Sequence, residues 1–118
     1  MKNFEETLPW QKTQEFANEA YAVLENSKEQ WFKEEILETA FLAGSNVARG
    51  HEKYNDEENI KYLGYAKDSL IKCRSMIFMA EKMSICDEKN SRNLQEKATS
   101  AFKVINGLIK HIREKKAA

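Results

Sequence analysis

The residues that could do chemistry in this chain are few and far apart. Neither Cys73 nor Cys86 has another Cys or His at the spacing of a zinc site. No Glu lies three residues before His51 or His111, so the Glu-x-x-His pairs of a di-iron bundle are missing. Gly-rich phosphate loops, nucleophile elbows and zinc-protease helices are missing too. These patterns favour a protein that is not an enzyme and holds no cofactor or metal.

Cationic side chains gather near the end of the chain, where they could contact the phosphates of RNA or DNA. They are Lys103, Lys110, Arg113, Lys115 and Lys116. Residues 60–118 carry 13 Lys and Arg against 6 Asp and Glu, whereas residues 1–59 carry 6 against 13. The alternative is an ordinary solvated face, which the net charge of zero favours. The two halves of the chain would then pair with each other, or each half would attract its own partner.

The composition indicates one soluble all-α domain spanning residues 1–118. The chain has 42% hydrophobic and 32% charged residues, which is typical of a folded domain. Its 4 Gly and 1 Pro are too few for the turns of a many-stranded β fold. Because no apolar run resembles a signal peptide or a membrane span, we expect a cytoplasmic protein without membrane contact.

Apolar periodicity predicts four helices, over residues 8–26, 27–49, 56–84 and 91–115. The candidate N-caps are Thr7, Ser27, Asn55 or Asp56, and Ser91. Gly50 is expected to end the second helix in a left-handed conformation, which places His51 in a loop. Four amphipathic helices with short connections predict an antiparallel up-down-up-down four-helix bundle.

The third predicted helix has more apolar surface than one bundle core can cover. Leu63, Ala66, Leu70, Cys73, Ile77 and Ala80 form its core stripe. Two further groups flank that stripe, Ile60, Ile71 and Phe78 on one side and Tyr65, Met76 and Met83 on the other. Trp31 and Leu42 lie on a charged face of the second helix. These eight residues outside the stripe predict an oligomer interface, and two separate flanks suit a head-to-tail ring. The alternative is a monomer whose N-terminal segment or loops cover them.

Four segments resemble the small bundle proteins encoded in 23S rRNA intervening sequences. Residues 8–12 (Leu-Pro-Trp-Gln-Lys) resemble the family's opening, Leu-x-Val-Trp-Gln-Lys-Ala, which includes Trp10. Residues 45–50 (Ser-Asn-Val-Ala-Arg-Gly) resemble Ile-Pro-Ser-Asn-Ile-Ala-Glu-Gly, with Asn46 and Gly50 retained, Gly44 in place of Pro and Arg49 in place of Glu. Residues 59–70 resemble Phe-x-x-Phe-Leu-x-x-Ala-x-Gly-Ser-Leu, and residues 104–110 resemble the closing helix.

The resemblance implies a four-helix bundle that assembles as a homopentameric ring. A related group serves reverse transcriptases of diversity-generating retroelements as an accessory protein and binds nucleic acid through basic surfaces. We therefore expect a non-enzymatic, self-assembling binding or scaffolding module. The first alternative is an RNA- or DNA-binding accessory factor that uses the basic end of the fourth helix, and the second is a ligand- or metal-binding bundle.

Overall fold

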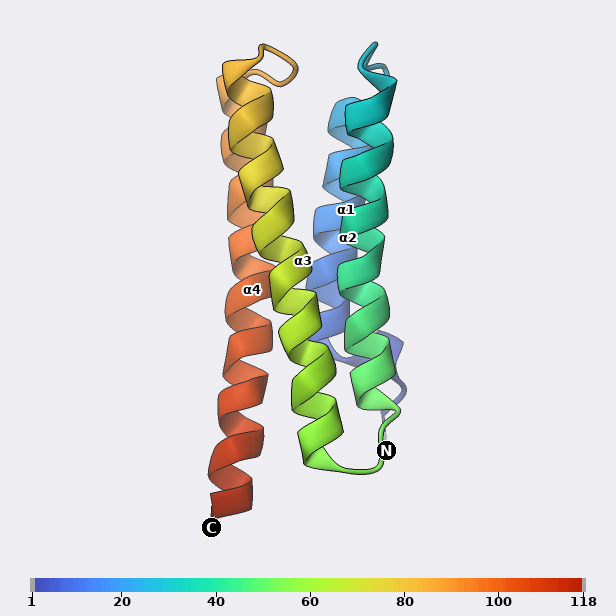
Figure 1. Ribbon diagram of the computed structural model, residues 1–118, viewed down its shortest axis with the longest axis vertical. Helices are drawn as coiled ribbons and strands as arrows, with labels where there is room; N and C mark the ends of the chain where they lie inside the picture. The colour runs from blue at the N-terminus through green and yellow to red at the C-terminus, as the bar shows by residue number, and fades with distance from the viewer. Residues whose placement is uncertain (1, 118) are drawn as a thin grey trace.

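Four α-helices pack side by side into an antiparallel bundle (Figure 1). The computed structural model describes residues 2–117, and no β-strand occurs among them. A short 3₁₀ helix, η1 (Phe4–Glu6), precedes α1 (Leu8–Leu24), α2 (Gln30–His51), α3 (Asp56–Lys82) and α4 (Glu88–Ala117). Each helix contacts its neighbours in the chain, and α4 also contacts α1, which closes the bundle. The molecule measures 49 × 20 × 18 Å, and no helix in the described range is long and apolar enough to cross a membrane.

The core stripe predicted for the third helix is confirmed. All six of its residues are buried, and they meet the apolar stripes of the other three helices in a single cluster. Two large aromatic side chains, Tyr21 on α1 and Phe41 on α2, lie half-exposed outside this cluster. On α4, Ile109 is buried and Leu108 only partly so, because the helical period brings Ile109 closer to the bundle axis.

Three of the predicted N-caps do not cap a helix with their side chains. Thr7 occupies the N-cap position of α1 as predicted, but its hydroxyl donates to the Phe4 carbonyl at 2.6 Å and accepts no hydrogen bond from the helix. Ser27 accepts from the Glu29 N–H at 3.1 Å, and α2 begins only at Gln30. Ser91 is buried within α4, whose first turn is closed by Asp87 accepting from the Asn90 N–H at 2.7 Å. Asp87 thus caps α4, whereas neither α1 nor α2 has a side-chain cap.

The Asn55 cap is confirmed, because its side chain accepts a hydrogen bond from the Glu58 N–H at 2.8 Å. The three acidic residues that follow it lie in the first turn of α3, where negative charge suits the helix dipole. This capped end of α3 is at the end of the bundle where the chain also begins and ends (Figure 1).

The role predicted for Gly50 is wrong. Gly50 lies inside α2, no glycine among the described residues has a positive φ, and His51 belongs to the last helical turn. A Cβ atom at Gly50 would lie 2.9 Å from Asn59 Oδ1 and 3.1 Å from the Asn59 carbonyl oxygen. The glycine is therefore explained by the close approach of α3, and not by the end of the helix.

Candidate interaction surfaces

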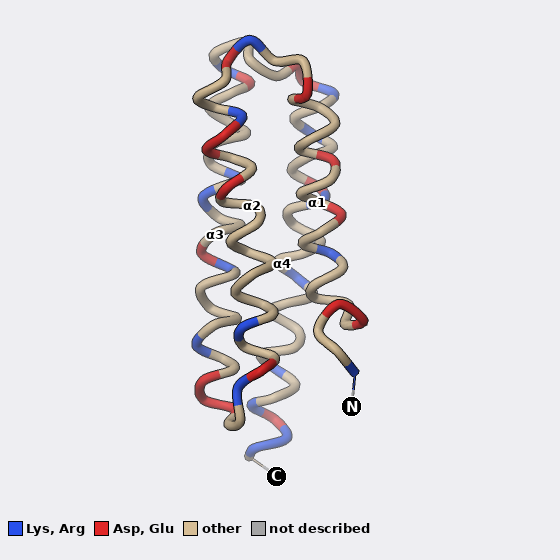
Figure 2. The backbone as a smooth tube through the Cα atoms, turned by 90° about the vertical axis from the view of Figure 1, so that its right-hand side faces the viewer, with Lys and Arg blue, Asp and Glu red and all other residues tan. Residues whose placement is uncertain are grey.

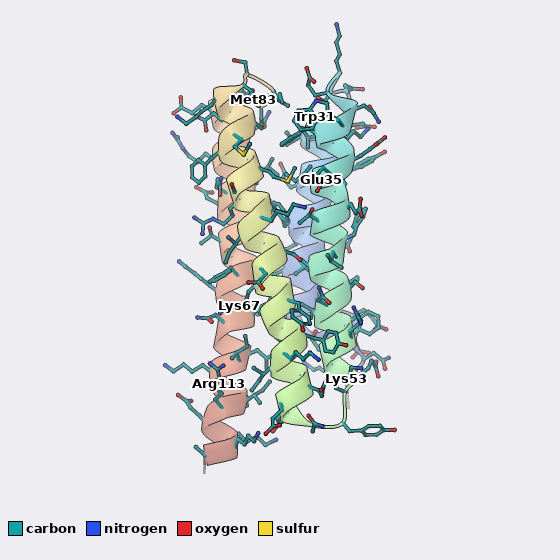
Figure 3. The ribbon with its side chains drawn as sticks, in the orientation of Figure 1. Trp31, Glu35, Lys53, Lys67, Met83 and Arg113 are labelled. Carbon is teal, nitrogen blue, oxygen red and sulfur yellow. The ribbon has the colours of Figure 1, made fainter. Side chains whose placement is uncertain are left out.

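One end of the face between α2 and α3 is apolar and open (Figure 3). Trp31 and Met83 lie there, on neighbouring helices, and both are more than half exposed. Together with Met76 and Met79 they border a hollow of about 40 Å³. The Trp31 indole N–H donates to Glu29 at 3.0 Å, and its ring packs edge-on against Phe32, with ring centres 5.8 Å apart.

An ion pair crosses the same face about one helical turn from Trp31. Lys72 Nζ on α3 lies 2.6 Å from Glu35 Oε1 on α2. The hydrogen bond and charge of Glu35 raise the pKa of Lys72 above its usual value. Both side chains are exposed, so the pair aligns the two helices more than it stabilises them. The pair also joins the acidic half of the chain to the basic half, as the Lys116–Glu57 pair does at 3.1 Å.

Three cations surround the ring of Tyr62 at the other end of the face between α2 and α3. The Arg49 guanidinium lies 4.6 Å from the centre of the Tyr62 ring, Lys53 Nζ 5.0 Å and Lys61 Nζ 5.7 Å from it. Arg49 also donates to the Tyr62 hydroxyl at 3.3 Å. Arg49 stands where the family has Glu, and in this structure its guanidinium packs on the Tyr62 ring of α3.

The face between α3 and α4 combines cations with apolar side chains. Lys67 on α3 donates to Asn106 on α4 at 2.8 Å and lies 5.1 Å from the centre of the Phe102 ring. Arg74 donates to Gln95 at 3.2 Å. Ile71 and Phe78 continue the same ridge of α3 at steps of three and four residues. Both are about half exposed.

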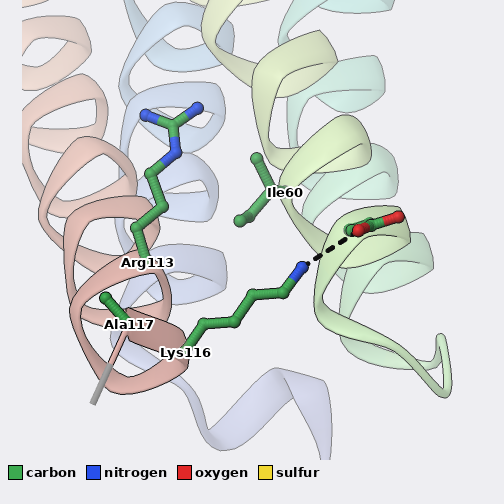
Figure 4. A pocket seen from close by; sticks show the side chains of 5 residues that line it. Ile60, Arg113, Lys116 and Ala117 are labelled. Carbon is green, nitrogen blue, oxygen red and sulfur yellow. Dashed lines mark hydrogen bonds and ion pairs between the residues drawn. The ribbon is translucent and has the colours of Figure 1, made fainter.

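Lys and Arg residues are spread along the bundle among Asp and Glu residues (Figure 2). The five cations predicted to contact nucleic acid lie on more than one side of α4. Lys103, Lys110 and Arg113 follow one side of α4 at steps of seven and three residues. Lys115 points to a different side, because two residues of an α-helix turn it by about 200° from Arg113. None of these four forms an ion pair with another residue between 2 and 117. Lys116 pairs with Glu57 beside an open hollow of about 460 Å³, which Ile60, Arg113 and Ala117 also line (Figure 4).

Six of the eight residues predicted to form an oligomer interface are exposed. Trp31, Leu42, Tyr65, Ile71, Phe78 and Met83 have between 44% and 57% of their surfaces accessible. Ile60 and Met76 are partly buried against the core of their own bundle. No segment of the described chain covers the six, and the N-terminal segment instead packs on α1 and α2.

The three residues carried over from the family motif have structural positions. Trp10 packs edge-on against Phe4, with ring centres 5.8 Å apart, and borders Gly44 where α1 meets α2. Asn46 is only 4% exposed, so its amide lies within the bundle and not on the surface. With Gly50 against α3, these positions account for helix contacts and provide no surface for a partner.

The Cys and His residues lie on different elements, Cys73 on α3, Cys86 in the loop after α3, His51 on α2 and His111 on α4. Burial raises the pKa of the Cys73 thiol to about 12 and also raises the pKa of Cys86. His111 is exposed, and His51 Nε2 lies 2.8 Å from the Lys2 carbonyl oxygen. Across residues 2–117 no three metal-binding side chains come together.

Sequence reasoning missed several members of these surfaces. Lys67, Arg74 and Tyr62 were not singled out, because their partners lie on other helices. Met79 was also missed, although its spacing from Met76 and Met83 by three and four residues could have indicated a shared side of the helix.

A bundle of four antiparallel helices with exposed apolar and charged faces is thus the class of protein that this structure defines. The chain also matches the family described as "23S rRNA-intervening sequence protein" over residues 5–107. It belongs to that family, as the four motifs predicted.

The chain is similar in fold to a solved structure. It is the crystal structure of a protein of unknown function from the S23 ribosomal protein family of Bacteroides thetaiotaomicron VPI-5482. The two chains are 18% identical and superpose with a TM-score of 0.77, covering 87% of this chain and 99% of the other. At this identity the likeness concerns the fold alone. No curated protein matches the chain.

Proposed function

We propose that the protein is a non-enzymatic bundle that assembles with copies of itself and acts as a binding or scaffolding module. The observation that carries this proposal is the set of six large apolar side chains left half-exposed on α2 and α3. A homopentamer is the expected assembly, and the number five rests on the family resemblance.

Burying the exposed surface of these apolar side chains between two copies lowers the free energy, because that surface leaves water. Fully burying one large apolar side chain contributes roughly 1.5–3 kcal/mol. Burial of the exposed half of six such groups therefore contributes several kcal/mol, which opposes the loss of translational and rotational freedom on association. Met79, also more than half exposed, adds to the same surface.

Light scattering after size exclusion tests the proposal. At micromolar concentration we expect a mass several times the 13.7 kDa of the chain. Phe78→Glu should lower the mass while the far-ultraviolet circular dichroism stays helical, because Phe78 lies outside the core. Tyr54→Glu is the matched control, since Tyr54 is fully exposed in the loop between α2 and α3. A wild-type mass near 13.7 kDa would refute self-assembly.

A second candidate function is binding of RNA or DNA. It is supported by Lys103, Lys110 and Arg113, which share one side of α4 and have no carboxylate partner within the described residues. Phosphate contacts of this kind give an affinity that falls steeply as salt rises.

Fluorescence anisotropy with a labelled RNA and a labelled DNA at about 50 mM salt would measure this binding. Lys103→Glu with Lys110→Glu should weaken it for all sequences alike, whereas Lys28→Glu, in the loop before α2, should have a smaller effect. Absence of binding by the wild type at micromolar protein would remove this candidate.

A further inference from the structure

We propose that two unlike faces of the bundle recognise each other, so that an acidic face on one copy docks onto a basic face on the next. The inference rests on the proposed self-assembly and specifies which surfaces meet. The partner is a second copy of this chain, placed beside the first in the same orientation.

The acidic face lies on the outer side of α2, next to α3. It consists of Trp31, Glu34, Glu35, Glu38 and Leu42, all of them exposed. Lys72 is the cation that reaches this face, and Glu35 already neutralises it at 2.6 Å. Glu34 and Glu38 form no ion pair within residues 2–117, so their charges are available to a partner. Trp31 and Leu42 supply apolar contacts at either end of the carboxylates.

The basic face lies on the outer side of α3 and α4. It consists of Lys67, Ile71, Arg74, Phe78, Arg92 and Lys103. Acids also lie among these groups. Glu96 borders the same hollow as Arg92 and Lys103, Glu81 lies seven residues after Arg74 on the same side of α3, and Glu88 pairs with Arg92 at 2.8 Å. Cations remain in excess, with Ile71 and Phe78 as the apolar centre. The two faces are therefore opposite in charge, and both contain large exposed apolar side chains.

The two faces also lie at the same height along the bundle. Glu35 contacts Lys72, and Arg74, half a turn further along α3, contacts Gln95. The carboxylates of α2 are therefore level with the part of α4 that Arg92 and Lys103 enclose. In an antiparallel bundle α2 and α4 run in the same direction (Figure 1). Parallel copies can thus bring acids beside cations without a shift along the axis.

The angle between the two faces of one copy determines whether repeated contacts form a closed ring or an open filament. The acidic face borders the side of the bundle that α2 and α3 form, and the basic face lies on the side that α3 and α4 form. These two sides are adjacent in a four-helix bundle and meet at about a right angle. A head-to-tail contact closes into a ring when each step turns the next copy. A turn close to a right angle closes a small ring with α3 on the inside, whereas opposite faces would produce an open filament.

Charge reversal provides the test, with light scattering and sedimentation velocity as the measurements. Glu34→Lys with Glu38→Lys makes the acidic face basic, and Arg92→Glu with Lys103→Glu makes the basic face acidic. Each pair of substitutions alone should raise the dissociation constant about tenfold or more, because like charges then meet. All four substitutions in one chain should restore assembly, because both faces are reversed together. Glu5→Lys with Glu25→Lys and Lys28→Glu with Lys115→Glu are the controls of matched charge, away from both faces.

The outcomes separate this inference from the proposed function. Loss of assembly in both reversed variants and recovery in the fourfold variant would support the pairing of unlike faces. A wild-type oligomer that either reversed variant leaves intact, or that the fourfold variant fails to restore, would overturn it while self-assembly stands. A monomeric wild type would overturn both. Helical circular dichroism of every variant ensures that lost assembly is not lost folding.

Discussion

Gly50 offers the sharpest test of how α2 and α3 pack. A methyl group there would lie 3.1 Å from the Asn59 carbonyl oxygen and 3.2 Å from Tyr62 Cβ, in addition to its 2.9 Å approach to Asn59 Oδ1. The amide can rotate away, but the carbonyl belongs to the backbone of α3, so the two helices must separate by a few tenths of an ångström. Overpacking of this kind costs about 1–3 kcal/mol.

Alanine also favours the helix over glycine by about 1 kcal/mol. The two effects oppose each other at Gly50, and we expect Gly50→Ala to lower the free energy of unfolding by up to about 2 kcal/mol. Gly107 is the matched control, because a Cβ atom there meets nothing within 4 Å. Gly107→Ala should gain the helical preference alone and raise the free energy of unfolding by about 0.5–1 kcal/mol.

Urea titration followed by circular dichroism at one protein concentration measures both changes, since assembly makes stability depend on concentration. The opposite signs of the two variants are the result to look for. If Gly50→Ala raised the free energy of unfolding as much as Gly107→Ala does, the close approach of α3 would not explain the glycine at position 50.

Three further predictions concern the stability of the bundle. Gly44→Ala should destabilise less than Gly50→Ala, because its new methyl group meets the Thr13 hydroxyl at 3.1 Å and not a backbone atom; the same urea titration compares them. Asn55→Ala should reduce the free energy of unfolding by about 1 kcal/mol through loss of the cap on Glu58, and Asn55→Asp should preserve it; equal loss in both would contradict the cap. The raised pKa of Cys73 means that the unfolded thiol ionises first, so stability should be complete below pH 9.0 and fall between about pH 9 and about pH 12; thermal unfolding across that range should show a shallower decline for Cys73→Ala.

The charge asymmetry along the chain has two consequences in the folded molecule. Part of it is neutralised internally, as the sequence led us to expect, by the pairs Glu35–Lys72 and Glu57–Lys116. Other charges remain on separate outer faces, notably Glu34 and Glu38 on α2. A net charge of zero therefore does not describe the surface that a partner meets.

The sequence by itself determined the class of fold and most of the core. The stripe from Leu63 to Ala80 repeats at steps of three and four residues, and such a period defines one side of a helix wherever that helix packs. The Asn55 cap was equally predictable, because the side chain and the amide that it binds are three residues apart. The same local patterns carried the family resemblance.

Only the tertiary structure decided what the glycines do and which charges stay free. The local sequence predicts that Gly50 ends a helix, whereas its role depends on Asn59, which approaches from α3. The sequence places Lys116 in a basic strip, whereas the fold brings Glu57 to 3.1 Å from its Nζ and neutralises it. Local spacing specifies which residues share a side of one helix, whereas the rotation and height of neighbouring helices follow from packing of the whole core, and those determine every contact between residues distant in the chain.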